Sequence, residues 1–191
     1  PDTILITGTR APPRNMSYLA DTVAAQLLAR APCAVLALHV VHPAMLGQPR
    51  SVLLPFTMAA AAPLAALALL RLLAPELHEL HVLVVHELSR LRFRLLGRRA
   101  AQRLIEQALE CGLRIETQIR EGLADNHCRL DASAAVSDDA AKETLALAGR
   151  LRSRLIALDA AAVPERPGYG HPIEQLLRDS ASNVVLYRAA R

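Results

Sequence analysis

Short apolar runs alternate with longer segments rich in alanine and leucine along the chain. The apolar runs are continuous rather than alternating with polar residues, which is typical of strands buried on both faces of a parallel sheet. This order predicts an α/β fold with a mostly parallel sheet flanked by helices. The expected strands are 4–7, 34–41, 52–56, 79–86, 114–120, 154–158 and 183–187; the expected helices are 17–30, 63–74, 91–111, 138–150 and 172–179; residues 121–137 are expected to be irregular.

The composition fits an intracellular globular chain. Aromatic residues make up 3% of the 191 residues, so alanine, leucine and valine must fill the core. Three cysteines without a C-x-x-C spacing, Cys33, Cys111 and Cys128, argue against a disulfide framework or a zinc site and predict a reduced, cytoplasmic setting. The net charge of +4 is mild. It suits an anionic ligand or a membrane surface and gives no reason to expect nucleic acid.

Residues 52–70 contain no charged side chain, and this length meets the requirement for a membrane-spanning helix. Pro55 and Pro63 interrupt the stretch, and its four consecutive alanines gain little from transfer into lipid. We therefore expect a strand followed by a helix.

Two distant segments repeat one helix–strand pattern. The run DTVAAQLLARAPCAVLALH at residues 21–39 aligns without a gap with GHPIEQLLRDSASNVVLYR at residues 170–188. Both have Gln-Leu-Leu in the same place, then a short polar break and an apolar strand. The chain therefore contains two copies of one unit.

These segments resemble the universal stress proteins. That family opens with a strand ending in aspartate, and it closes with a strand, a loop of the form G-x-x-G-x9-G-[ST], a helix and an apolar last strand. RSVLLPFTMAAAAPLAALALLRLLA resembles the opening strand and helix, HELHVLVVHEL the second strand, RLIALDAAAV the strand before the loop, and GHPIEQLLRDSASNVVLYR the closing pair. The resemblance implies a universal stress protein-like fold, related to the adenine nucleotide alpha hydrolases.

The N-terminal segment resembles the closing half of the same family. Gly8 falls on the first glycine of the loop pattern, Ala11 on the second, and Asp21 and Thr22 on the final pair. A rival alignment takes this segment as an opening strand, helix and strand, as in the cytosolic tails of transporters that carry stress-protein-like domains. Both alignments leave a partial unit.

The domain organisation follows from the resemblance. We expect an additional N-terminal βαβ unit at residues 1–42, a linker at 43–50 with proline and glycine, and a universal stress protein-like domain at 51–191.

The resemblance also locates a nucleotide site that has lost its usual residues. In ATP-binding members, small loop residues let the backbone approach the phosphates, and the following helix offers free amides. Here Thr57 replaces the opening aspartate, Asp159 and Ala162 replace the first two glycines, and Gly170-His171 replaces Gly-Ser or Gly-Thr. We therefore expect weak or absent ATP binding. The candidate positions are Thr57, Asp159, Gly170 and His171, with Gly8 and Thr22 in the N-terminal copy.

Six arginines form the densest basic cluster in the chain: Arg90, Arg92, Arg94, Arg98, Arg99 and Arg103. They suit a polyphosphate, an acidic partner or an anionic membrane leaflet. The competing interpretation, which a charge run favours on its own, is a solvated helix start.

No catalytic or metal-binding constellation emerges from the sequence. Asp138 and Asp139 fit a helix start, where carboxylates favour the dipole. The histidines at 78, 81 and 86 do not converge as metal ligands. We expect neither a catalytic residue nor a metal.

The favoured function is therefore a non-enzymatic regulatory and dimerisation domain, whose units pair through their last strands. It is expected as the cytosolic C-terminal domain of a membrane transporter, at the inner face of the membrane. The alternative is a soluble tandem universal stress protein that binds ATP or another nucleotide through a variant loop. The expected partners are a second copy, an attached transmembrane domain and a small anionic ligand.

Overall fold

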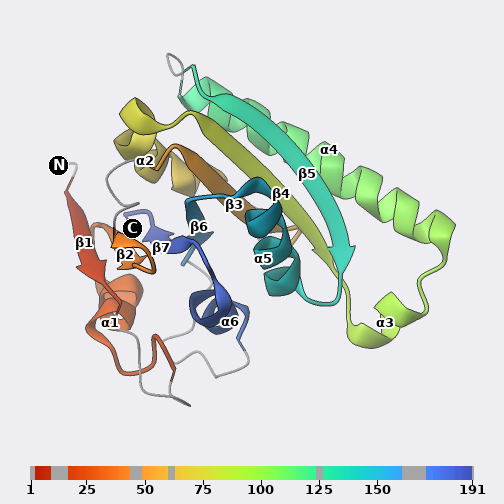
Figure 1. The fold of residues 1–191 in the computed structure, drawn as a ribbon, viewed down its shortest axis with the longest axis horizontal. Helices are drawn as coiled ribbons and strands as arrows, with labels where there is room; N and C mark the ends of the chain where they lie inside the picture. The colour runs from red at the N-terminus through yellow and green to blue at the C-terminus, as the bar shows by residue number, and fades with distance from the viewer. Residues whose placement is uncertain are drawn as a thin grey trace.

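The computed structural model describes residues 3–9, 17–43, 49–59, 63–123, 127–160 and 171–190. Within these residues, seven strands form one sheet in the order β1-β2-β7-β6-β3-β4-β5 (Figure 1). Neighbouring strands are parallel except β2 and β7, which are antiparallel. The predicted α/β fold and the N-terminal βαβ unit are confirmed.

The strands are β1 (Ile4–Gly8), β2 (Ala34–His39), β3 (Ser51–Thr57), β4 (Glu79–Glu87), β5 (Arg129–Ser137), β6 (Leu155–Asp159) and β7 (Asn183–Arg188). The helices are α1 (Val23–Arg30), α2 (Pro63–Leu73), α3 (Arg90–Arg94), α4 (Arg98–Gly122), α5 (Ala140–Leu151) and α6 (Pro172–Asp179), with a 3-10 turn at Ala74–Glu76.

Helices cover both faces of the sheet and form two apolar cores. On one face, buried residues of α1, α5 and α6 pack on the strands; on the other, buried residues of α2 and α4 do so. Alanine, leucine, isoleucine and valine supply most of both cores. The sheet is therefore enclosed where β6, β3 and β4 lie.

Two predicted elements are wrong. The predicted strand at 114–120 lies inside α4, where Ile115 and Ile119, four residues apart, are both buried. The predicted irregular stretch contains β5, which pairs with β4 over nine positions. Gly112 lies inside α4, where an added Cβ would make only ordinary contacts with Ala132 and Val84.

The uncharged stretch at residues 52–70 divides into β3 and α2, as predicted. In the described part of the chain, no helix combines the length and apolar character needed to cross a membrane.

Strands β2 and β7 pair around a single centre. The register is Val35↔Arg188, Leu36↔Tyr187, Ala37↔Leu186, Leu38↔Val185 and His39↔Val184. Ala37 thus lies opposite Leu186, which is also its counterpart in the gap-free sequence repeat. On either side of this pair, Leu36 pairs with Tyr187, the counterpart of Leu38, and Leu38 pairs with Val185, the counterpart of Leu36. The two copies are therefore related by a local twofold axis, the symmetry of an isologous contact.

The strand before each copy repeats the same relation. Ile4 pairs with Ala34 in the first copy as Leu155 pairs with Asn183 in the second. The sequence repeat thus extends to β1 and β6, with a shorter connection in the second copy: 13 residues separate Gly8 from Thr22, and 11 separate Asp159 from His171.

Candidate functional site

The central strands β3 and β6 end at a place where the strand order reverses direction. From β3 the chain moves outward to β4 and β5, and then returns to β6 on the other side. Open α/β sheets bind ligands outside the carboxyl ends of the strands at such a switch point. Thr57 is the last residue of β3 and Asp159 the last of β6. The structure brings these two predicted positions to neighbouring strand ends.

An open cavity of about 540 Å³ lies beside Thr57. Its lining comes from the ends of β3 and β4 and from the residue before the α5 cap: Thr57, Met58, Ala59, His86, Glu87, Leu88, Ser89, Arg90 and Asp138. The Nδ1 atom of His86 is buried and has no hydrogen-bond partner among the described residues. Arg90 lies 4.0 Å from the Asp138 carboxylate. The cavity therefore combines one basic residue, two acidic ones and a histidine.

Helix α6 is the next helix after β6 among the described residues. Two backbone N–H groups that a ligand would use in the first turn of α6 are absent or already bonded. His171 is the N-cap, and its Nδ1 accepts a hydrogen bond from the N–H of Ile173 at 3.3 Å. Pro172, the first helical residue, has no N–H to offer. Two donors that an anion would use at a helix N-terminus are thus missing.

Glu174, also in this first turn, is fully buried, with 0% of its surface exposed. Its carboxylate accepts hydrogen bonds from the Ser17 hydroxyl at 2.5 Å and from the N–H groups of Tyr18 and Leu19 at 2.7 and 2.9 Å. Backbone amides that converge in this way form an anion-binding concavity. The Glu174 side chain of the second copy therefore fills an anion site formed by residues 17–19, in the loop before helix α1 of the first copy.

Asn183 and Arg188 make similar contacts between the copies. The Asn183 Oδ1 accepts from the N–H groups of Val41 and His42, both at 2.8 Å. The Arg188 guanidinium is buried and donates to the carbonyl groups of Ala31 and Cys33. Ala31 caps the carboxyl end of α1, where a cation favours the helix dipole.

Asp159 also affects the last strand. It pairs with Tyr187 in the sheet register. Burial, and secondarily the Asp159 carboxylate, raise the pKa of the Tyr187 phenol far above its ordinary range. The phenol therefore stays protonated and neutral.

Gly8 and Thr22, the predicted positions in the N-terminal copy, do not lie with Thr57 and Asp159. Strands β1 and β2 run in the opposite direction to β7, β6 and β3. Gly8, at the end of β1, therefore lies at the opposite end of the strands from Thr57 and Asp159. Thr22 caps α1: its hydroxyl accepts from the Ala25 N–H and donates to the Leu19 carbonyl. The structure therefore does not gather all predicted positions into one site.

The backbone conformation of Asp21 explains why the loop pattern has a glycine at this position. Its φ is 58°, in the left-handed region that glycine adopts most easily. This position aligns with the last glycine of the pattern. Ala11, Ala162 and Gly170, which were also aligned with loop glycines, lie outside the described residues.

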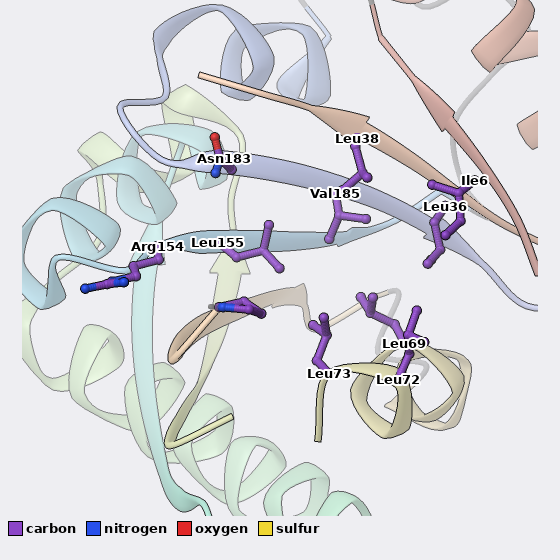
Figure 2. A pocket seen from close by; sticks show the side chains of 11 residues that line it. Ile6, Leu36, Leu38, Leu69, Leu72, Leu73, Arg154, Leu155, Asn183 and Val185 are labelled. Atoms are coloured by element: carbon purple, nitrogen blue, oxygen red, sulfur yellow. The ribbon is translucent and has the colours of Figure 1, made fainter. Parts of the chain in front are cut away.

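A second, apolar cavity of about 230 Å³ lies on the sheet face that α2 covers (Figure 2). Leu69, Leu72 and Leu73 of α2 face strand side chains across it. Ile6 of β1 lies at its edge and is 58% exposed, whereas Ala157, its counterpart in β6, is 1% exposed. This face is covered over the second copy and open over the first.

Glu174 was missed by the sequence analysis, although the repeat contains a signal for it. The gap-free alignment places Glu174 opposite Ala25, which is buried in α1. A carboxylate at a position that is apolar and buried in the other copy indicates a buried, partnered charge. His86 had no comparable signal, because a histidine at a strand end is equally typical of a solvated edge.

Comparison with known proteins supports the fold. No family model and no curated protein matches the sequence. A universal stress protein from Archaeoglobus fulgidus aligns with 98% of this chain at 15% identity and a TM-score of 0.56, and this chain spans 61% of its length. The hypothetical protein PH0823 aligns with 74% of this chain over 98% of its own length, at 15% identity and a TM-score of 0.54.

A third structure agrees with these two. Hypothetical protein MJ0577, whose structure served to assign a biochemical function, aligns with 71% of this chain over 94% of its own length. Its identity is 15% and its TM-score 0.51. The chain therefore has the fold of a universal stress protein domain, as the sequence resemblance implied.

Proposed function

We propose that this chain is a non-enzymatic regulatory domain of the universal stress protein type, in which association between stress-protein-like units takes the place of nucleotide binding. The observation that carries the proposal is the first turn of α6. Pro172 has no N–H, the N–H of Ile173 binds His171, and the Glu174 carboxylate is buried in the same turn. A phosphate there meets a like charge and lacks two of the usual donors.

The contacts between the copies support association as the role of this domain. Glu174, Asn183 and Arg188 each reach from the closing helix or strand to backbone groups of the N-terminal unit. Buried polar groups of this kind cost free energy unless they are satisfied, so they favour one partner over others. We propose that they specify the pairing of β7 with β2.

We further propose a place of action in the cytosol, on the inner side of a membrane transporter to which the domain is attached. This part rests on the resemblance to transporter tails. The predicted homodimer needs a surface other than the edge of β7, because β7 pairs with β2 on one side and with β6 on the other.

Calorimetric titration of the chain with ATP and Mg²⁺ tests the loss of nucleotide binding. We expect no heat of binding at millimolar ATP, because the phosphate-binding groups are absent or used. The matched variant is Glu174→Gln, which removes the negative charge at nearly constant shape. Micromolar binding of ATP to the unsubstituted chain contradicts the proposal.

A second candidate function is nucleotide binding through a variant loop. The open cavity beside Thr57, with Arg90 at its rim, is the observation that favours it. In that case Thr57→Trp fills the cavity and abolishes ATP binding, while Arg150→Gln, at an exposed position of α5, leaves the affinity unchanged.

Sedimentation equilibrium tests the proposed homodimer, and a monomer at the highest soluble concentration contradicts it.

A further inference from the structure

Helix α3 and the residues around it expose three large apolar side chains. Leu91, Phe93 and Leu95 are 69%, 37% and 77% exposed. No residue of α3 is buried. Apolar side chains that stay this exposed add little to the stability of the fold, and clusters of them mark interaction sites. Their role therefore lies outside the folded chain.

The same segment is strongly basic. Residues 88–105 contain six arginines and no acidic residue. Arg90 lies 4.0 Å from Asp138. The other five, which are exposed, form no ion pair with any residue that the structure describes: Arg92, Arg94, Arg98, Arg99 and Arg103. The positive charge is thus available to an external partner.

Helix α3 lies at the periphery of the molecule. Helix α3 lies beyond the end of β5, at the lower right in Figure 1, with the sheet and its covering helices on one side only. It is five residues long, and its N-cap residue Ser89 makes no side-chain capping bond. A helix this short is marginal in water, so contact with a partner would stabilise it.

We propose that this α3 patch, formed by Leu91, Phe93, Leu95 and the six arginines, binds the surface of a membrane that contains anionic lipids. The apolar side chains enter the boundary between headgroups and acyl chains, and the guanidinium groups bind lipid phosphates. Leu91 and Leu95, four residues apart, share one side of the helix and lead the insertion, whereas Phe93 projects from the other side. The aliphatic stems of the neighbouring arginines lie along apolar surface while their charges stay at headgroup level.

Charge alone does not distinguish the lipid surface from another polyanion. An RNA satisfies the arginines but leaves Leu91 and Leu95 in water. A bilayer with anionic lipid satisfies both the charge and the apolar surface. Arg90 belongs both to the α3 patch and to the open cavity beside Thr57. The variants below leave Arg90 and the first turn of α6 unchanged, so they test the patch separately from either candidate nucleotide site.

The test is co-sedimentation of the whole chain with vesicles of phosphatidylcholine alone and of phosphatidylcholine with one quarter phosphatidylglycerol. We expect binding to the anionic vesicles that weakens as salt is raised. Each arginine near an anionic surface contributes about a fivefold factor, so Arg92→Gln, Arg94→Gln, Arg98→Gln and Arg99→Gln together lower partitioning by roughly 600-fold.

Substitution of the apolar side chains separates insertion from simple attraction. The variant Leu91→Ser, Phe93→Ser, Leu95→Ser keeps every arginine, and we expect it to lose at least tenfold in partitioning. Two matched controls remove the same residue types elsewhere on the surface: Leu109→Ser with Leu113→Ser, and Arg114→Gln with Arg150→Gln. Both controls should bind as the unsubstituted chain does, and thermal unfolding checks that all variants are folded.

Because the chain contains no tryptophan, Leu95→Trp, at the most exposed of the three apolar positions, supplies a single reporter. We expect its fluorescence to shift to the blue on anionic vesicles and to be quenched by brominated lipid. Absence of binding to anionic vesicles at low salt overturns the proposal. So does a serine variant that binds undiminished, or a chain that binds RNA but not vesicles.

Discussion

The two copies of the helix–strand unit, α1–β2 and α6–β7, agree in register and differ in chemistry. Their last strands pair symmetrically, with Ala37 opposite Leu186. In the second copy, Glu174, Asn183 and Arg188 supply buried polar side chains; their counterparts in the first copy are Ala25, Ala34 and His39. A symmetric backbone therefore carries an asymmetric set of contacts.

The difference indicates which pairing the second copy is built for. Two identical second copies placed across the same axis would each bring a buried carboxylate and a buried guanidinium without the loop and the helix end to which they now hydrogen-bond. Unsatisfied buried charge is costly. The contacts therefore favour the first copy as partner over a second copy of the same kind, and the following substitutions test this comparison.

Removal of the Glu174 carboxylate should have the largest effect. Glu174→Ala leaves the Ser17 hydroxyl and the N–H groups of Tyr18 and Leu19 without their acceptor. Because hydrogen bonds to charged groups are strong and unsatisfied buried donors are costly, we expect a loss of about 3 kcal/mol or more in the free energy of unfolding. Urea unfolding measures it, and Glu106→Ala, at an exposed position of α4, is the control. A loss below 1 kcal/mol would falsify the role of Glu174.

Strands β6 and β1, which neighbour β7 and β2, should also differ in the free energy that a truncated core side chain costs. Ile156 of β6 is fully buried, whereas Leu5, its counterpart in β1, is partly exposed. Ile156→Ala should cost about 3 kcal/mol and Leu5→Ala about 1 kcal/mol, since the cost follows the burial and the cavity created. Equal costs would show that β1 is buried as well as β6 on the face that α1, α5 and α6 cover.

The two helix caps offer a smaller contrast. Thr22 caps α1 with a hydroxyl, and His171 caps α6 with a ring nitrogen in front of a proline. Thr22→Ala should cost about 1 kcal/mol, a typical value for a lost cap. His171→Ala should cost about half of that, because its bond is long and Pro172 needs no acceptor. The reverse order in thermal unfolding would contradict this account of the caps.

The smallest effect concerns pH, and it should arise from His39 rather than from its counterpart Arg188. Burial lowers the pKa of His39 below its ordinary value of 6.5. The unfolded chain then binds the proton more readily than the folded chain. The stability contributed by neutral His39 is therefore complete above pH 6.5 and is lost as pH falls toward the folded-state pKa.

His39→Gln should flatten the fall in unfolding free energy between neutral pH and pH 5. His81, whose pKa burial also lowers, contributes a fall of the same sign. The double variant with His81→Gln should therefore be flatter still. An unchanged slope in both variants would assign the pH dependence to other groups.

Much of the fold was predictable because strand and helix patterns are strong where residues are apolar. The ends of β3 and β6 were predicted at Phe56 and Leu158, one residue before the observed ends at Thr57 and Asp159. Strand β5 was not, because RLDASAAVS contains mostly small and polar residues with weak strand preference. Its pairing with β4, a contact distant in sequence, makes it a strand. The end of α4 was missed because residues 114–120 were interpreted as a strand, whereas they continue the helix to Gly122.

The candidate site was less predictable than the fold. A loop pattern indicates where phosphate-binding groups are missing, but it does not show what replaces them. That Pro172 and His171 use up the helix terminus follows from local sequence, whereas the partners of Glu174 come from residues 17–19 and depend on how the two copies dock.

The antiparallel seam between β2 and β7 also sets an order of events during synthesis. Strand β2 is made well before its partner β7, because 143 residues separate His39, the end of β2, from Asn183, the start of β7. Domains usually fold from the N-terminus as they are made. Here the first unit must wait for the second, with apolar residues such as Leu36 and Leu38 unprotected until β7 has been made. Such a delay exposes the nascent chain to aggregation and gives chaperones a defined segment to hold.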